Sequence, residues 1–178
     1  MDLTRREFLK ICAGSAVALG ISQICIPEVV EALERAAAGN PPVLWLQGAG
    51  CTGCSVSLLN TTHPKISEIL LKIISLKVHP NLMSASGDRA ILSMEKTAEE
   101  AKGKFILIVE GSIPMADNGI YATLGEKNGT PISLLEWTKK LGNNAKYVIA
   151  AGTCSSYGGI PAGAPDPTGA KAVEDILD

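Results

Sequence analysis

Short apolar runs alternate with amphipathic stretches along the chain after residue 40. Four of these runs are too short for helices and are bounded by glycine, proline or charged residues, so they predict buried strands. They cover 43–47, 76–79, 105–109 and 147–150. The run Phe-Ile-Leu-Ile-Val at 105–109 is continuously apolar. Such a run is typical of a central parallel strand that is buried on both faces.

Helical spacing occurs between these runs. After Pro64, apolar residues recur at i, i+3, i+4, i+7 and i+8, which predicts an amphipathic helix; they are Ile66, Ile69, Leu70, Ile73 and Ile74. Further helices are expected from about Cys54, over 90–102, from Ser133 to Leu141 and from Ala170. Ser133 is a good N-cap because Glu136 stands three residues on, as a capping box requires.

The alternation of strands and helices predicts an α/β domain with a mostly parallel sheet and right-handed crossovers. One globular domain fits a chain of 178 residues with 46% apolar and 19% charged residues. A looser region is expected between the third strand and Ser133, where Asn118-Gly119 and Asn128-Gly129 occur.

The charge balance argues against a nucleic-acid partner. The formal net charge is -2, and no basic stripe is present to hold a phosphate backbone. Only two Phe, two Trp and three Tyr are available for stacking on bases. We therefore expect no nucleic acid among the partners.

The first 38 residues are predicted to be a twin-arginine export signal. Thr-Arg-Arg-Glu-Phe-Leu-Lys at 4–10 precedes a weakly apolar run at 11–24, which is short for a membrane span. The alternative is an amphipathic helix with two chance arginines. Cleavage is expected after Ala38, so that 39–178 form the exported domain. This route carries folded proteins to the periplasm, commonly because a cofactor is inserted in the cytoplasm, and it therefore favours a cofactor.

Three cysteines follow predicted strands in glycine-rich segments. Cys51 and Cys54 come after the first strand and Cys154 after the last, whereas Cys12 and Cys25 belong to the predicted signal or its tail. The carboxyl ends of parallel strands meet at one edge of the sheet, where α/β domains hold their ligands. We therefore expect these three thiols to form one site.

Several kinds of site are compatible with Cys-x-x-Cys. A redox dithiol does not need a third cysteine, and zinc requires a fourth ligand, whereas His63 and His79 fall outside the loops with the thiols. An iron-sulfur cluster is favoured because glycine-rich turns let backbone amides approach sulfur, provided that a fourth thiolate lies beyond Asp178. The remaining alternative is that the cysteines are buried apolar residues.

Three other residues are candidates for a role in or near the site. Glu110 ends the third strand and could orient partners or carry protons, but a capped, solvated carboxylate is the simpler expectation. Trp45 is expected in the core. His63 precedes Pro64 and is expected to start a helix rather than to bind a metal.

Three motifs resemble the small subunit of nickel-iron hydrogenases. They are Gly-Cys-Thr-Gly-Cys-Ser at 50–55, Val-Glu-Gly-Ser-Ile-Pro at 109–114 and Gly-Thr-Cys-Ser-Ser-Tyr-Gly-Gly-Ile-Pro at 152–161. The resemblance implies the family's amino-terminal flavodoxin-like domain, with helices on both faces of the sheet. It also implies a proximal 4Fe-4S cluster bound by Cys51, Cys54 and Cys154. The family's fourth ligand lies in a later Pro-Gly-Cys-Pro-Pro segment that this sequence does not contain.

The resemblance further implies an electron-transfer role beside a large subunit that holds the nickel-iron, or nickel-iron-selenium, site. A redox acceptor such as a cytochrome and a periplasmic location are implied, with membrane association left open. The family's carboxyl-terminal domain, which binds two further clusters, is absent from the sequence, and the last predicted helix has no terminating signal. The chain is therefore expected to be an amino-terminal portion of a longer protein, and this portion is expected to be inactive alone. The alternative is an exported iron-sulfur relay or sensor protein, and a flavin-binding module is disfavoured because cysteine occupies its phosphate loop.

Departures from the family pattern narrow the expected cluster type. Oxygen-tolerant members carry extra cysteines at positions that correspond here to Gly53 and Ala122. An ordinary cubane and oxygen sensitivity are therefore expected. Many members have a glutamate where this chain has Gly50, so no proton-path role is expected at that position.

Overall fold

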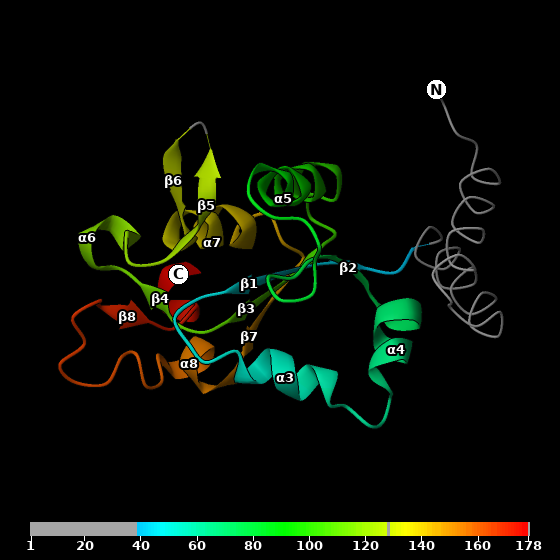
Figure 1. Cartoon of the computed structure of the whole chain (residues 1–178), viewed down its shortest axis with the longest axis horizontal. Helices are drawn as coiled ribbons and strands as arrows, with labels where there is room; N and C mark the ends of the chain where they lie inside the picture. The colour runs from blue at the N-terminus through cyan, green and yellow to red at the C-terminus, as the bar shows by residue number, and fades with distance from the viewer. Residues whose placement is uncertain (1–38, 128, 178) are drawn as a thin grey trace.

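A parallel four-stranded sheet lies between two layers of helices in the computed structural model (Figure 1). The structure describes residues 39–127 and 129–177. The predicted export signal at 1–38 lies outside these ranges. The expected α/β class, with helices on both faces of a mostly parallel sheet, is confirmed.

The sheet has the strand order β2-β1-β3-β7, with parallel pairing throughout. Its strands are β1 (Pro42–Gln47), β2 (Ser75–Val78), β3 (Ile106–Glu110) and β7 (Tyr147–Ala151). Each predicted strand is confirmed to within one residue at either end. Glu110 pairs with Gln47 on one side and with Ala151 on the other, so three strands end together at one edge.

Helices cover both faces of this sheet, with α5 and α7 on one face and α3 and α8 on the other (Figure 1). The helices are α3 (Gly53–Leu59), α4 (Ile66–Glu68), α5 (Asp88–Glu100), α7 (Leu134–Gly142) and α8 (Gly152–Tyr157). The predicted N-cap of α7 is confirmed, because the Ser133 hydroxyl accepts the Glu136 amide at 3.1 Å.

The amphipathic run after Pro64 is helical but not a regular α-helix. After the single turn of α4 it continues as the π-helix η2 (Ile69–Ile73), where the Ile74 amide donates to the Ile69 carbonyl at 3.0 Å. A π-turn holds more residues than an α-turn, so the apolar side chains no longer form one stripe. As a result, Ile73 remains 48% exposed.

Smaller elements differ from the sequence prediction. The region expected to be loose contains a hairpin, and the helix expected from Ala170 starts four residues later because Ala170 and Lys171 pair with a short strand. These elements are β4 (Ile113–Pro114), α6 (Ala116–Gly119), β5 (Thr123–Lys127), β6 (Thr130–Ser133), β8 (Ala170–Lys171) and α9 (Glu174–Leu177). The dipeptide Asn128-Gly129 between two short runs was a sequence signal for this hairpin.

The main apolar core fills the space between the sheet and the layer of α5 and α7. Its best buried members include Leu44, Leu46, Phe105, Leu107, Val109, Leu134, Trp137 and Leu141. Side chains alternate between the faces of a strand, so Trp45 and Glu110 point to the opposite face, toward α3. Trp45 is 5% exposed, which confirms its expected burial. No helix in the described part of the chain is long and apolar enough to span a membrane.

Candidate metal centre

The structure brings the three predicted thiols to the edge where β1, β3 and β7 end. Cys51 lies in the turn after β1, Cys54 in the first turn of α3 and Cys154 in α8, and all three thiols are free. The Cys54 thiol donates to the Ala151 carbonyl at 3.4 Å, three residues before Cys154. The loops after the first and last strands therefore meet.

Burial and neighbouring acidic groups both act on the Cys54 thiol. Burial raises the pKa of the Cys54 thiol, and negative charge on Glu110, Cys51 and Cys154 adds to the rise. A protonated Cys54 is the favoured form until a positively charged group replaces the proton.

Cys154 lies in a short helix, and not in a glycine loop as the sequence suggested. The turn starts at Gly152, whose φ is +80°, and α8 follows at once. Cys154 and Cys54 are therefore both presented from the first turns of helices, α8 directly after β7 and α3 after the turn that follows β1.

A glycine lies directly beside each sulfur. A Cβ atom on Gly152 would overlap the Cys54 sulfur, and one on Gly159 would lie 2.7 Å from the Cys154 sulfur. A Cβ atom on Gly53 would lie 3.1 Å from the Cys51 sulfur. Side chains are thus kept away from the thiols. This arrangement fits an inorganic cluster, whose sulfurs need close approach of the backbone.

The geometry of the thiols differs from that of a single-ion site. Within 39–127 and 129–177, no three His, Cys, Asp or Glu side chains are placed so that they could hold one metal ion. The three thiols are therefore not arranged around a single ion in the described part of the chain. An iron-sulfur cluster does not need such convergence, because its cysteine ligands bind different metal atoms.

A buried hydroxyl next to Cys154 is also consistent with a bound group. The Ser155 side chain is fully buried, and its Oγ has no hydrogen-bond partner among the residues that the structure describes. Buried polar groups without a partner are uncommon in proteins, and a bound group that supplies the partner is one explanation. The residues present therefore fit a cofactor at this edge.

Glu110 is buried behind the first cysteine pair. Its side chain is only 2% exposed, which corrects the expectation of a solvated carboxylate. Oε1 accepts the amides of Cys54 at 3.0 Å and Ser55 at 3.1 Å. Oε2 accepts the Trp45 indole N–H at 3.0 Å and the Ser55 hydroxyl. The carboxylate is capped by these donors, as expected, but it lies in the interior and not in water, because α3 lies over the end of β3.

His79 extends this network, although sequence reasoning placed it outside the site. It is 1% exposed, its ring centroid lies 4.9 Å from that of Trp45, and its Nε2 lies 3.3 Å from the Ser55 hydroxyl. Burial lowers the pKa of His79, while the negative charge of Glu110 opposes this shift. One signal was available, since His79 directly follows β2 and so reaches the same sheet edge. His63 is exposed, away from this network.

Comparison with known proteins identifies the family. Residues 51–178 match the family described as NADH ubiquinone oxidoreductase, 20 Kd subunit. The chain belongs to this family. The match begins at Cys51 and includes all three thiols of the candidate centre together with Glu110.

Hydrogenase small subunits are among the relatives. The chain is 46% identical to the periplasmic NiFeSe hydrogenase small subunit of Desulfomicrobium baculatum, over 99% of this chain and 58% of the relative. It is 42% identical to the periplasmic NiFe hydrogenase small subunit 1 of Nitratidesulfovibrio vulgaris, over 98% of this chain and 53% of the relative. The chain thus spans just over half the length of these curated relatives.

A solved structure agrees with the sequence relatives. The NiFeSe hydrogenase from Desulfovibrio vulgaris Hildenborough superposes with a TM-score of 0.77 and 51% identity. The alignment covers 80% of this chain and 50% of that chain. The resemblance to hydrogenase small subunits that the three motifs indicated is confirmed as homology.

Proposed function

We propose that this chain is the electron-transfer part of a nickel-iron-type hydrogenase small subunit, with Cys51, Cys54 and Cys154 as three ligands of a proximal 4Fe-4S cluster. The observation that carries the proposal is the contact between the Cys54 thiol and the Ala151 carbonyl, which joins the two cysteine segments at one edge. Homology to hydrogenase small subunits supports the class of protein. Since such clusters take four cysteines, the proposal requires a fourth thiolate beyond Asp178.

The residues of this chain would hold and shield the cluster. When bound, such a cluster accepts and releases single electrons. Hydrogen activation would take place on the large subunit, and this chain would relay electrons between that site and an outer acceptor such as a cytochrome. Trp45, Glu110 and Ser55 close the inner side of the site, because all three are buried.

Exposed apolar side chains on the thiol segments and on the adjoining strand β7 support a protein partner. Tyr157 is 81% exposed and Ile160 is 91% exposed, and both follow Cys154 closely in the chain. Further large apolar side chains with about half of their surface exposed lie on α3 and β7; they are Val56, Tyr147 and Ile149. Apolar surface of this kind is typical of interfaces. We assign it to contact with a large subunit in a heterodimer.

The cluster type and location complete the proposal. Gly53 and Ala122 occupy the positions where oxygen-tolerant relatives carry cysteines, so we propose an ordinary cubane and oxygen sensitivity. Ala122 is partly buried against the apolar core. Export by the twin-arginine route would place the complex in the periplasm, which is consistent with the periplasmic relatives.

A second candidate is an iron-sulfur relay or sensor protein that works without hydrogen. It is supported by the family match, because the family is described as NADH ubiquinone oxidoreductase, 20 Kd subunit. The two candidates share the cluster and differ in the partner. Hydrogen-dependent activity therefore separates them.

The test is to express the complete reading frame together with its large subunit. We expect hydrogen-dependent dye reduction and the electron paramagnetic resonance signals of iron-sulfur clusters. Cys154→Ser should abolish the dye reduction and lower the iron content, whereas Thr153→Ser, an exposed neighbour, should change neither. A Cys154→Ser complex with full activity and unchanged cluster spectra would contradict the proposal. A normal cluster without hydrogen-dependent activity would favour the relay protein.

A further inference from the structure

We propose that Glu110 is a positioning residue that fixes the Cys54 thiolate and also lowers the reduction potential of the bound cluster through its negative charge. This inference rests on the proposed function, because it requires a cluster bound at Cys54.

The positioning role follows from how α3 begins. Thr52, the N-cap residue of α3, has a φ of 61° and makes no side-chain cap hydrogen bond. The Glu110 carboxylate instead accepts two consecutive amides of the first turn, from Cys54 and Ser55. A helix needs acceptors for its first amides, and here a distant strand supplies the acceptor. The position of Cys54 is thereby tied to the end of β3.

The partners of Glu110 suit a charged carboxylate. All four hydrogen bonds to Glu110 are donated by its three partner residues, and an ionised carboxylate only accepts. His79 Nδ1 accepts the Asn81 amide at 3.2 Å, so Nε2 carries the hydrogen of a neutral imidazole and donates it to the Ser55 hydroxyl. Ser55 can then donate its own hydrogen to Glu110. The chain of donors therefore points toward the carboxylate.

The charge of Glu110 is not neutralised by a cation. Among 39–127 and 129–177, no Lys or Arg forms an ion pair with Glu110. The carboxylate is buried, where charges are screened less than at the surface. A negative charge close to a cluster disfavours the addition of an electron, so it lowers the reduction potential.

The hydrogen bonds of Glu110 act in the same direction. Amide donors to the sulfurs of a cluster stabilise its reduced form and raise the potential. The amides of Cys54 and Ser55 are already bonded to Glu110, so they are not available to the cluster. Glu110 thus adds negative charge and withholds two donors.

The test uses Glu110→Gln in the complete small subunit bound to its large subunit. Glutamine keeps an oxygen that can accept both amides of α3 and removes the charge, while its NH2 group replaces Oε2, the acceptor of the Trp45 indole N–H. We expect unchanged iron content and, at a fixed solution potential, a reduced-to-oxidised ratio of the proximal cluster about tenfold higher. For a one-electron couple this corresponds to a rise of ~59 mV in a redox titration monitored by electron paramagnetic resonance.

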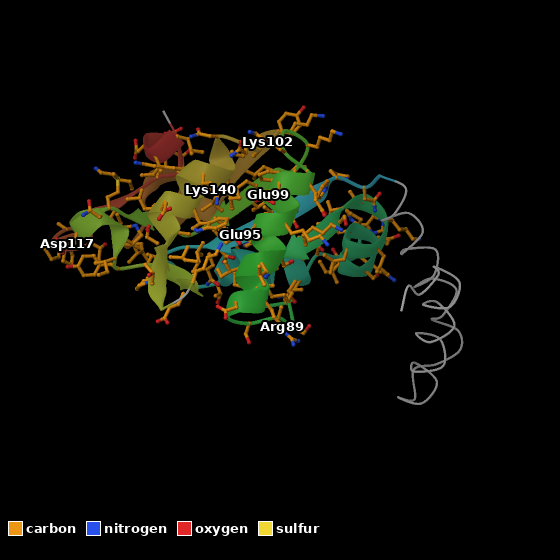
Figure 2. The ribbon with its side chains drawn as sticks, turned by 90° about the horizontal axis from the view of Figure 1, so that it is seen from above. Arg89, Glu95, Glu99, Lys102, Asp117 and Lys140 are labelled. Atoms are coloured by element: carbon orange, nitrogen blue, oxygen red, sulfur yellow. The ribbon has the colours of Figure 1, made fainter. Side chains whose placement is uncertain are left out.

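Two further variants separate charge from position. Glu110→Asp keeps the charge but shortens the side chain, so it should leave the potential near that of the wild type and lower the cluster content. Glu99→Gln is the matched control, because it removes one exposed carboxylate from α5, on the layer away from the thiols (Figure 2). It should change neither the potential nor the cluster content.

An unchanged potential in a Glu110→Gln complex with full cluster content would overturn the inference. Loss of the cluster from Glu110→Gln would overturn it as well, because the amide retains the acceptor that positions α3. A wild-type complex without the cluster signal would instead contradict the proposed function. The two failures are therefore distinguishable.

Discussion

The Cys54 amide donates a hydrogen bond to the Glu110 carboxylate over 3.0 Å, although 56 residues separate them in the chain. The parallel pairing of β1 with β3 makes this contact possible, because it places Gln47 opposite Glu110. The turn that carries Cys51 and Cys54 then starts beside the end of β3. The first cysteine pair is thus held by the sheet as well as by its own turn.

Gly159→Ala should disturb Cys154, the third proposed ligand of the cluster. The new Cβ atom would lie 2.7 Å from the Cys154 sulfur, a distance at which one of the two must move. We expect the iron content of the purified complex to fall several-fold, measured by metal analysis and visible absorption.

Gly169→Ala is the matched control for this substitution. Its φ of +59° is close to the +58° of Gly159, so both alanines carry a similar backbone strain of roughly 1–2 kcal/mol. The new Cβ atom at Gly169 would meet its nearest neighbour at an ordinary 3.4 Å. Equal cluster content in the two variants would show that crowding at the Cys154 sulfur is unimportant.

Leu141→Ala should destabilise the domain strongly. Leu141 is fully buried in the core between α7 and the sheet, so its truncation leaves a cavity and should lower the free energy of unfolding by about 2–5 kcal/mol. Urea unfolding followed by tryptophan fluorescence measures this change. Leu92→Ala on α5 removes the same atoms from a side chain that is 58% exposed and should cost about 0.5 kcal/mol or less. A similar loss of unfolding free energy in Leu141→Ala and Leu92→Ala would contradict the assignment of Leu141 to the core.

Acidification should destabilise the fold through His79. Its pKa is lowered in the folded protein from the ordinary 6.5, so His79 stays neutral while the unfolded chain takes up a proton. The stability linked to His79 is therefore complete above pH 6.5 and is lost as the pH falls below this value toward the lowered pKa. The negative charge of Glu110 limits the shift.

Thermal unfolding of the wild type and His79→Gln between pH 7.5 and 5 checks this linkage. The wild type should lose stability on acidification more steeply than His79→Gln, because the variant lacks the titrating group. His63→Gln, at an exposed position, should follow the wild-type curve. Parallel curves for the wild type and His79→Gln would rule out the contribution of His79.

Local sequence was enough to predict the strands of the sheet and the thiol segments. Short apolar runs bounded by turn residues favour buried strands at this length, and parallel strands bring the segments that follow them to one edge. Ser133 was also predictable as an N-cap from local sequence, because its hydroxyl bonds to an amide only three residues away. These features depend on neighbours in the chain.

Tertiary contacts decided the surroundings of the thiols. A glutamate at a strand end is normally solvated, and only the packing of α3 over β3 buries Glu110 among four donors. The place of His79 against Trp45 likewise depends on the pairing of β2 with β1. The sequence by itself determined which residues end the strands. The sheet register and the helix above it decided which of those residues lose contact with water, because burial requires groups that are distant in the chain.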